Sequence, residues 1–145
     1  MKSIGSSVKF LLNLSRAQSS LVKRFDAGMG NGIGFNEFLI LFYLSQAPEQ
    51  KMRRIDLAEK VGLTASGVTR LLLPMEKIGL VTGGSVEEDA RVRSVILSKG
   101  GKQKLSDALK RFEFLADNVC SGIKTQEIKD FSDLLIAVGG KILMS

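Results

Sequence analysis

Apolar residues recur every three or four positions along most of the chain, a spacing that is typical of amphipathic helices. Thr64 and Ser98 stand where helix caps are expected, and Gly62 and Gly79 stand where helices should end. The pattern predicts helices over residues 6–25, 35–46, 54–61, 64–79, 98–119 and 125–144. The first is long for a small protein, and some further surface must cover its apolar stripe.

Between the fourth and fifth helices the pattern changes to the alternation of short strands. Residues 80–82 and 92–97 predict a β-hairpin around a loop at 83–91. The chain is therefore expected to be mainly α with a small β-hairpin wing. Earlier in the chain, four glycines between residues 28 and 34 predict a flexible connection, which is the clearest internal boundary.

The order helix, helix, turn, helix and hairpin is the layout of a winged helix-turn-helix. It predicts a DNA-binding domain over residues 34–100, with helical regions at 1–33 and 101–145 on either side. Ala58 is small where two helices must cross closely, and Gly62 permits the turn between them. In such a unit the second helix projects its first turns into the major groove of DNA.

Small or hydrogen-bonding side chains occupy the first turns of the helix that Thr64 caps. They suit a close approach to base edges and phosphates. The DNA contacts predicted there are Thr64, Ala65, Ser66, Gly67, Thr69 and Arg70. Many helix-turn-helix units only dock other proteins, so the alternative is a winged-helix interaction module that does not bind DNA.

Two arginines of the predicted hairpin give a second signal. Arg91 and Arg93 lie near its turn, and an arginine on a protruding hairpin can enter the narrow minor groove. Asp89 stands two residues before Arg91 and can hold its guanidinium in a fixed pose. We add all three to the predicted DNA contacts. The simpler alternative is a solvated turn with an exposed ion pair.

Composition narrows the possible functions. The 145 residues include no histidine and one cysteine, Cys120. Histidine is the most common general base and metal ligand, so catalytic triads, Cys–His pairs and histidine-based zinc sites are excluded. We therefore expect no enzyme activity, metal or cofactor. The 21 basic and 15 acidic residues leave a net charge of +6, which indicates an acidic partner such as nucleic acid or a membrane surface.

The number of cysteines and the hydropathy of the chain indicate the cellular compartment of the protein. A lone cysteine is typical of a reducing compartment. No sustained apolar run follows the N-terminus, and no stretch approaches the roughly 18 apolar residues of a membrane span. We expect a cytoplasmic protein with no membrane segment. Because Cys120 has no second thiol in the chain, a buried or half-buried thiol is favoured over a redox switch.

Five short motifs occur in the order and at the spacing of one protein family. They are LAEKVGLT (57–64), VTRL (68–71), EKIGLV (76–81), DAR (89–91) and LSKGG (97–101). Each is a weak signal alone. Together they resemble the MarR family of bacterial transcriptional regulators.

The resemblance implies a homodimer built from the two chain ends, so that regions 1–33 and 101–145 form a helical dimerisation region. It implies that the helix from Thr64 reads a palindromic operator and that Arg91 reaches the minor groove. It also implies a small phenolic or other anionic effector, bound between the DNA-binding and dimerisation parts. Leu14, Phe38 and Phe42 are candidate pocket residues, although each also suits the core.

The chain departs from the family pattern at several positions. Arg53 stands where a Ser or Thr usually caps the third helix, and we expect Arg53 to contact a DNA phosphate instead. Thr82 stands where an arginine often follows the strand, which puts one backbone contact in doubt. Glu87 and Glu88 in the wing loop would repel phosphate. The acidic pair and the missing arginine at Thr82 are the support for the interaction module as the alternative function.

Overall fold

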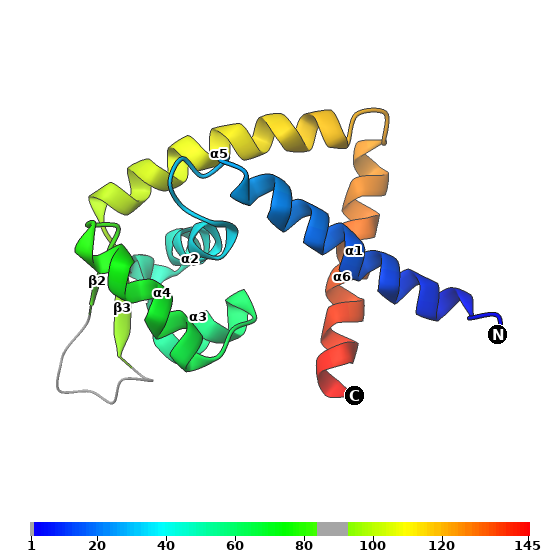
Figure 1. The fold of residues 1–145 in the computed structure, drawn as a ribbon, viewed down its shortest axis with the longest axis horizontal. Helices are drawn as coiled ribbons and strands as arrows, with labels where there is room; N and C mark the ends of the chain where they lie inside the picture. The colour runs from blue at the N-terminus through cyan, green and yellow to red at the C-terminus, as the bar shows by residue number, and fades with distance from the viewer. Residues whose placement is uncertain (1, 84–92) are drawn as a thin grey trace. The chain divides into compact units, whose positions relative to one another are not determined.

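The computed structural model describes residues 2–83 and 93–145. Its contacts divide the chain into two compact units, Met1–Phe112 and Glu113–Ser145. The described residues form these helices (Figure 1): α1 (Ser6–Asp26), α2 (Phe35–Gln46), α3 (Arg54–Val61), α4 (Ala65–Lys77), α5 (Lys99–Val119) and α6 (Thr125–Met144). The helices predicted from the apolar periodicity are therefore confirmed to within a few residues.

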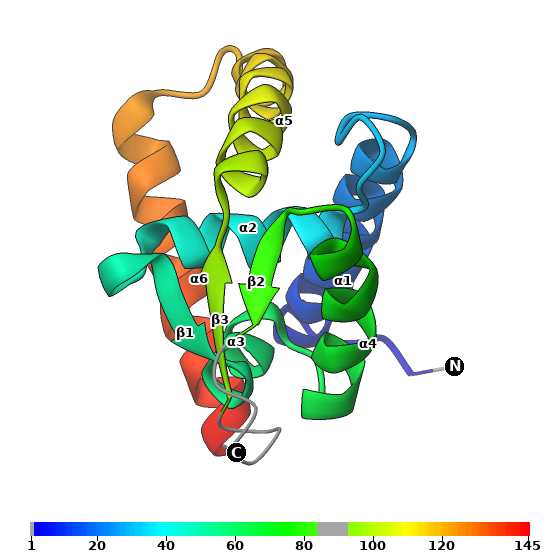
Figure 2. The same cartoon turned by 90° about the vertical axis from the view of Figure 1, so that its left-hand side faces the viewer.

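The predicted hairpin is part of a larger sheet. Strands β2 (Val81–Gly83) and β3 (Ser94–Leu97) pair antiparallel, with Val81 opposite Leu97. A third strand that the sequence pattern did not predict, β1 (Lys51–Arg53), pairs on the other side of β3, as Figure 2 shows. A turn of 3-10 helix, Pro48–Gln50, leads into β1. A strand of three residues is too short to show alternation, so it escaped the sequence pattern.

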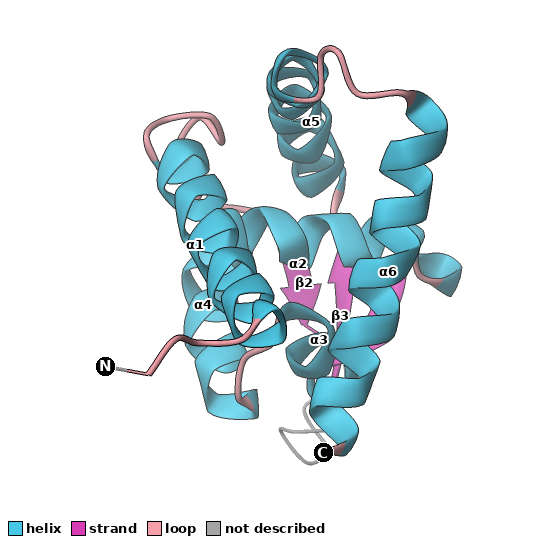
Figure 3. Ribbon diagram, turned by 90° about the vertical axis from the view of Figure 1, so that its right-hand side faces the viewer, coloured by secondary structure: helices cyan, strands magenta, loops and turns pink. Residues whose placement is uncertain are grey.

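Helix α2 forms the centre of the first unit. Its side chains Ile40, Leu41 and Leu44 have no exposed surface. The sheet and α3 pack against α2, and Figure 3 shows the magenta strands beside these two helices. Because α2 is apolar on most sides, it is buried on most sides and not only along one amphipathic face. The buried residues of α3 and α4 that complete this core are Leu57, Ala58, Val68, Leu72 and Met75.

Three phenylalanines join α1, α2 and α5 within the first unit. The ring centres of Phe25 and Phe38 are 4.9 Å apart, and those of Phe38 and Phe112 are 5.5 Å apart. Aromatic contacts at such distances contribute about 1 kcal/mol beyond the buried area. Phe38, a candidate for the effector pocket, is 4% exposed and belongs to this cluster. The cluster fixes the end of α1 against α2 and α5.

The glycine-rich connection between α1 and α2 is packed, which differs from the flexible link that the sequence predicted. Met29 and Ile33 are both 6% exposed. Two cations of α5 bind its backbone: Lys104 Nζ lies 2.9 Å from the Asn31 carbonyl oxygen, and Arg111 Nη1 lies 3.3 Å from that of Met29. The glycines therefore shape a turn around two apolar anchors.

The second unit contains the end of α5 and all of α6. None of the residues of α6 is buried within the described chain. Phe131 and Leu135 are 53% and 45% exposed, at a spacing that puts them on one face. We call this face the α6 stripe: Ile128, Phe131, Leu135, Val138 and Ile142. Among the described helices, none has the length and apolar character that crossing a membrane requires.

Candidate nucleic-acid interface

The turn between α3 and α4 follows from Gly62. This glycine ends α3 with φ +78°, a left-handed conformation that side chains with a Cβ rarely adopt. Its backbone N–H and that of Leu63 both donate to the Ala58 carbonyl oxygen, at 2.9 Å each. Ala58 is 4% exposed, so its small side chain lets the two helices approach closely. The predicted helix-turn-helix geometry is confirmed.

Thr64 caps the start of α4. Its Oγ1 accepts a hydrogen bond from the Gly67 backbone N–H at 3.0 Å, as the sequence predicted. Such a cap stabilises a helix by about 1 kcal/mol relative to alanine. A Cβ at Gly67 would lie 3.1 Å from the same oxygen, so glycine gives the cap room. The other free N–H groups of this turn lie at the positive end of the helix dipole and suit a phosphate oxygen.

The tip of α4 comprises Ala65, Ser66, Gly67, Thr69 and Arg70. Ser66 and Arg70 are exposed, while the other three are half-buried. No described residue forms an ion pair with Arg70. Thr69 differs from the rest because its Oγ1 already accepts a hydrogen bond from Arg54 Nη1 at 3.3 Å. The tip thus offers the Ser66 hydroxyl and the Arg70 cation to a partner. The neighbouring Thr69 hydroxyl is already hydrogen-bonded to Arg54.

Arg53 precedes α3 and is exposed, as a phosphate contact would require. Its Nε donates to Asp56 Oδ2 at 2.8 Å, and its Nη2 donates to Asp56 Oδ1 at 3.2 Å. These hydrogen bonds lower the pKa of Asp56 and raise that of Arg53. A DNA phosphate would therefore compete with Asp56 for the guanidinium. Arg53 makes no side-chain cap hydrogen bond at the start of α3, which agrees with the missing Ser or Thr.

Arg54 is a central residue that the sequence interpretation missed. It is 4% exposed, and its Nη2 lies 3.2 Å from Glu76 Oε1. The available signal was its spacing, since Arg54 shares a helical face with the apolar Leu57 and Ala58. Its partner Glu76 lies 22 positions later in the chain, beyond the reach of any local pattern.

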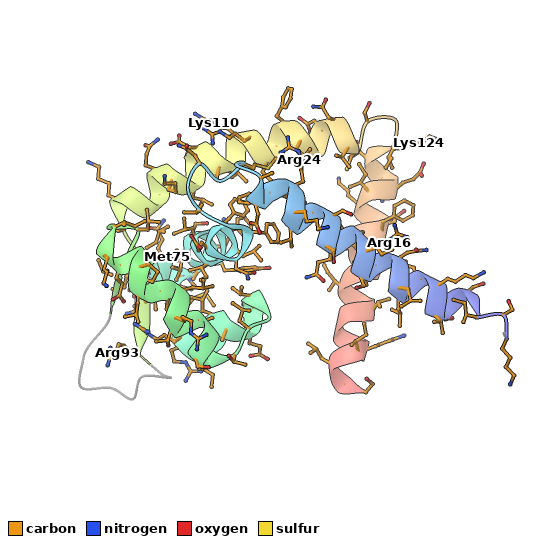
Figure 4. The ribbon with its side chains drawn as sticks, in the orientation of Figure 1. Arg16, Arg24, Met75, Arg93, Lys110 and Lys124 are labelled. Atoms are coloured by element: carbon orange, nitrogen blue, oxygen red, sulfur yellow. The ribbon has the colours of Figure 1, made fainter. Side chains whose placement is uncertain are left out.

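Arg93 stands at the base of the wing, immediately before β3 (Figure 4). Its side chain is half-buried, and its backbone carbonyl oxygen accepts a hydrogen bond from the Arg54 N–H at 3.0 Å. The other two wing residues predicted to contact DNA, Asp89 and Arg91, lie outside the described residues. The structure therefore brings Arg93 close to the start of α3. The DNA contacts of Asp89 and Arg91 stay predictions.

An open cavity of about 460 Å³ lies between the end of α2, β1 and α3. Its lining includes the Tyr43 ring, with Lys60 Nζ 6.0 Å from the ring centre, and also Lys51. Such a volume suits a small molecule, and the surrounding cations favour an anionic one. Of the pocket residues predicted from the sequence, Phe42 and Leu14 are half-buried and lie outside this lining.

The chain resembles known regulators in sequence and in fold. Residues 35–92 match the family model described as "MarR family". The chain is 25% identical over 134 residues to the uncharacterized HTH-type transcriptional regulator YdgJ of Bacillus subtilis (strain 168), covering 92% of this chain and 79% of the relative.

Solved structures share the fold at low sequence identity. A MarR/EmrR family transcriptional regulator from Acinetobacter sp. ADP1 has a TM-score of 0.82 at 17% identity, over 98% of this chain and 100% of that one. Sco3205, a MarR family transcriptional regulator from Streptomyces coelicolor in complex with DNA, has a TM-score of 0.78 at 18% identity, over 96% of this chain and 89% of that one. With the helix-turn-helix geometry, the family match shows that residues 35–92 carry a MarR-family winged helix-turn-helix, and the chain as a whole is similar to HTH-type transcriptional regulators.

Proposed function

We propose that the protein binds double-stranded DNA as a homodimer, with α4 in the major groove. The observation that carries this proposal is the capped, polar tip of α4, where Ser66 and Arg70 are exposed at the start of a helix. Arginine is the side chain that most often contacts guanine in the major groove, and serine suits base edges or phosphates. The fold relative Sco3205, whose structure contains DNA, supports the same use of this fold.

The net charge of +6 agrees with a polyanionic partner. Lysine and arginine side chains that neutralise phosphates release counterions, so we expect the affinity to fall steeply with salt. We propose that Arg53, exposed before α3, makes one such contact and that Arg93, at the base of the wing, makes another. Within the wing, we propose that Asp89 orients Arg91 toward the minor groove.

Surfaces that the described chain leaves uncovered support a homodimer. Phe131, Leu135 and Ile142 of the α6 stripe are exposed, and so are Val8, Leu11 and Leu12 of α1. Large apolar patches of this kind mark association sites in soluble proteins. We propose that regions 1–33 and 101–145 form the dimer, while 34–100 binds DNA. Two copies of α4 would then sit one DNA turn apart, roughly 34 Å, on a palindromic site.

Replacing Arg70 by alanine is expected to weaken DNA binding about tenfold, because one base or phosphate contact is lost. Arg91→Ala should also weaken binding through the wing. The measurement is a gel shift with duplex DNA flanking the protein's own gene, at one fixed salt concentration.

Lys110→Ala provides the control, since it removes the same charge from an exposed position of α5. Its affinity should stay close to that of the parent. If Arg70→Ala, Arg91→Ala and Thr69→Val all bind as the parent does, the placement of α4 and the wing on DNA is wrong. If the parent selects no duplex, the winged helix is an interaction module instead.

We further propose that a small phenolic or other anionic effector releases the protein from DNA. The open cavity beside Tyr43 and Lys60 supports this, because the Arg53–Asp56 pair at the start of α3 lines it. It lies within residues 34–100 and not between the two predicted regions, where the family resemblance put the effector. A panel of small phenols and aromatic carboxylates should include a ligand that raises the melting temperature. That ligand should bind Lys60→Ala more weakly. A binder unaffected by this change would place the effector site elsewhere.

A further inference from the structure

Among the described residues, Arg54 is the only charged residue that is buried, at 4% exposure. A buried charge requires partners that replace its lost hydration. Arg54 has two: Nη2 donates to Glu76 Oε1 at 3.2 Å, and Nη1 donates to Thr69 Oγ1 at 3.3 Å. Both partners belong to α4, so one side chain of α3 holds the neighbouring helix.

The two contacts are well separated along α4. Thr69 and Glu76 are seven residues apart in the sequence, which places them about two turns apart on the same face. The guanidinium is planar and its donors point in fixed directions, unlike the single rotating ammonium of lysine. Hydrogen bonds at two levels of the helix therefore oppose both rotation and tilt of α4 against α3.

Arg54 is also connected to the wing. Its backbone N–H donates to the Arg93 carbonyl oxygen at 3.0 Å, just before β3. Its partner Glu76 lies against β2, because a Cβ built at Gly83 would be 3.1 Å from Glu76 Oε1. Arg54 thus contacts α4 through its side chain and the residue before β3 through its backbone, and it is connected to β2 only through Glu76.

We propose that Arg54 is a positioning residue that sets the angle of α4 relative to the wing and thereby the DNA sequences that the protein selects. This inference rests on the proposed DNA-binding function. Arg54 itself is buried and does not contact DNA. It acts through Thr69, whose oxygen accepts from Arg54 and whose hydroxyl hydrogen is left to donate to an acceptor on a base or phosphate.

The test uses the full chain and a duplex that the parent protein selects from a random-sequence pool. The readout is the specificity ratio, which is the affinity for this duplex divided by that for an unselected duplex at the same salt concentration. Arg54→Lys keeps the charge but cannot make the two-level contact. Its ratio should fall about tenfold, a coupling within the range of contacting residues. A merely structural residue would lower the melting temperature and leave this ratio unchanged.

Thr69 variants provide a second measurement if Arg54→Lys folds poorly. Thr69→Val removes both the acceptor of the Arg54 hydrogen bond and the predicted DNA contact of this residue, and it should lower the ratio about tenfold. Where the double variant Arg54→Lys/Thr69→Val folds, its specificity ratio should fall by less than the product of the two single-variant fold-losses. The reason is that both substitutions interrupt the same hydrogen bond.

Three results would overturn the inference. One is an unchanged ratio in a folded Arg54→Lys variant. Another is a double variant whose loss equals the product of the two single losses. The third is a parent protein that selects no duplex, which would also overturn the proposed function. If the parent selects a duplex and Arg70→Ala weakens its binding, the first two results count against the role of Arg54 alone.

Discussion

Replacing Phe131 and Leu135 together by glutamate is expected to convert the protein to a monomer and to weaken specific DNA binding at least about a hundredfold. The two side chains are four residues apart on the α6 stripe and are 53% and 45% exposed in the single chain. Two carboxylates there would have to be desolvated in a dimer. Each monomer would then hold one half-site and lose the gain from linking two binding modules.

The measurement combines light scattering for molecular mass with a gel shift on a selected duplex. The matched control is Ser132→Glu/Ile136→Glu, which adds the same charges to α6 away from the stripe. Ile136 is 74% exposed, so this control also removes an exposed apolar side chain. If the stripe variant still has the mass of a dimer, or if the control dissociates equally, α6 does not form the interface as proposed.

Replacing Gly101 by alanine is expected to destabilise the protein by about 3 kcal/mol, at the upper end for overpacking. In a helix interior, this substitution alone would normally stabilise by about 1 kcal/mol. At Gly101, however, the new Cβ would lie 2.1 Å from the Leu80 carbonyl oxygen and 2.7 Å from Leu97 Cδ1. The backbone of α5 would have to move away from the first strand of the wing.

Urea unfolding at one protein concentration measures this change. Gly140→Ala is the matched control, because a Cβ there meets no atom within 4 Å and α6 is helical at that point. The control should be as stable as the parent or more stable. Equal stability of Gly101→Ala and the parent would mean that α5 does not approach the wing so closely.

The periodic pattern was sufficient for the helices because each helix buries or exposes a face of its own. The ends of α2 and α6 agree with the prediction to the residue, and the caps at Gly62 and Thr64 are local features of the sequence. The family resemblance is likewise confirmed over residues 35–92, and the curated relative that the chain resembles is a transcriptional regulator rather than an enzyme.

Features that depend on distant partners were not predicted. Arginine is a residue type that usually lies on the surface, and only its contact with Glu76 explains why Arg54 is buried. Strand β1 exists because β3 is available to pair with it. In the glycine-rich connection, the apolar side chains of Met29 and Ile33 were the missed signal, since an exposed flexible link has little use for them. The DNA contacts of the tip and wing stay predictions.

Strand β1 has a consequence for solubility. It forms one edge of the sheet, and an edge strand offers unpaired backbone groups to which a second protein can add a strand and start aggregation. β1 is only three residues long and carries exposed cations at both ends, Lys51 and Arg53. Short length and charge are the features by which natural proteins prevent such pairing. This edge of the sheet is therefore protected against pairing with a second copy of the chain.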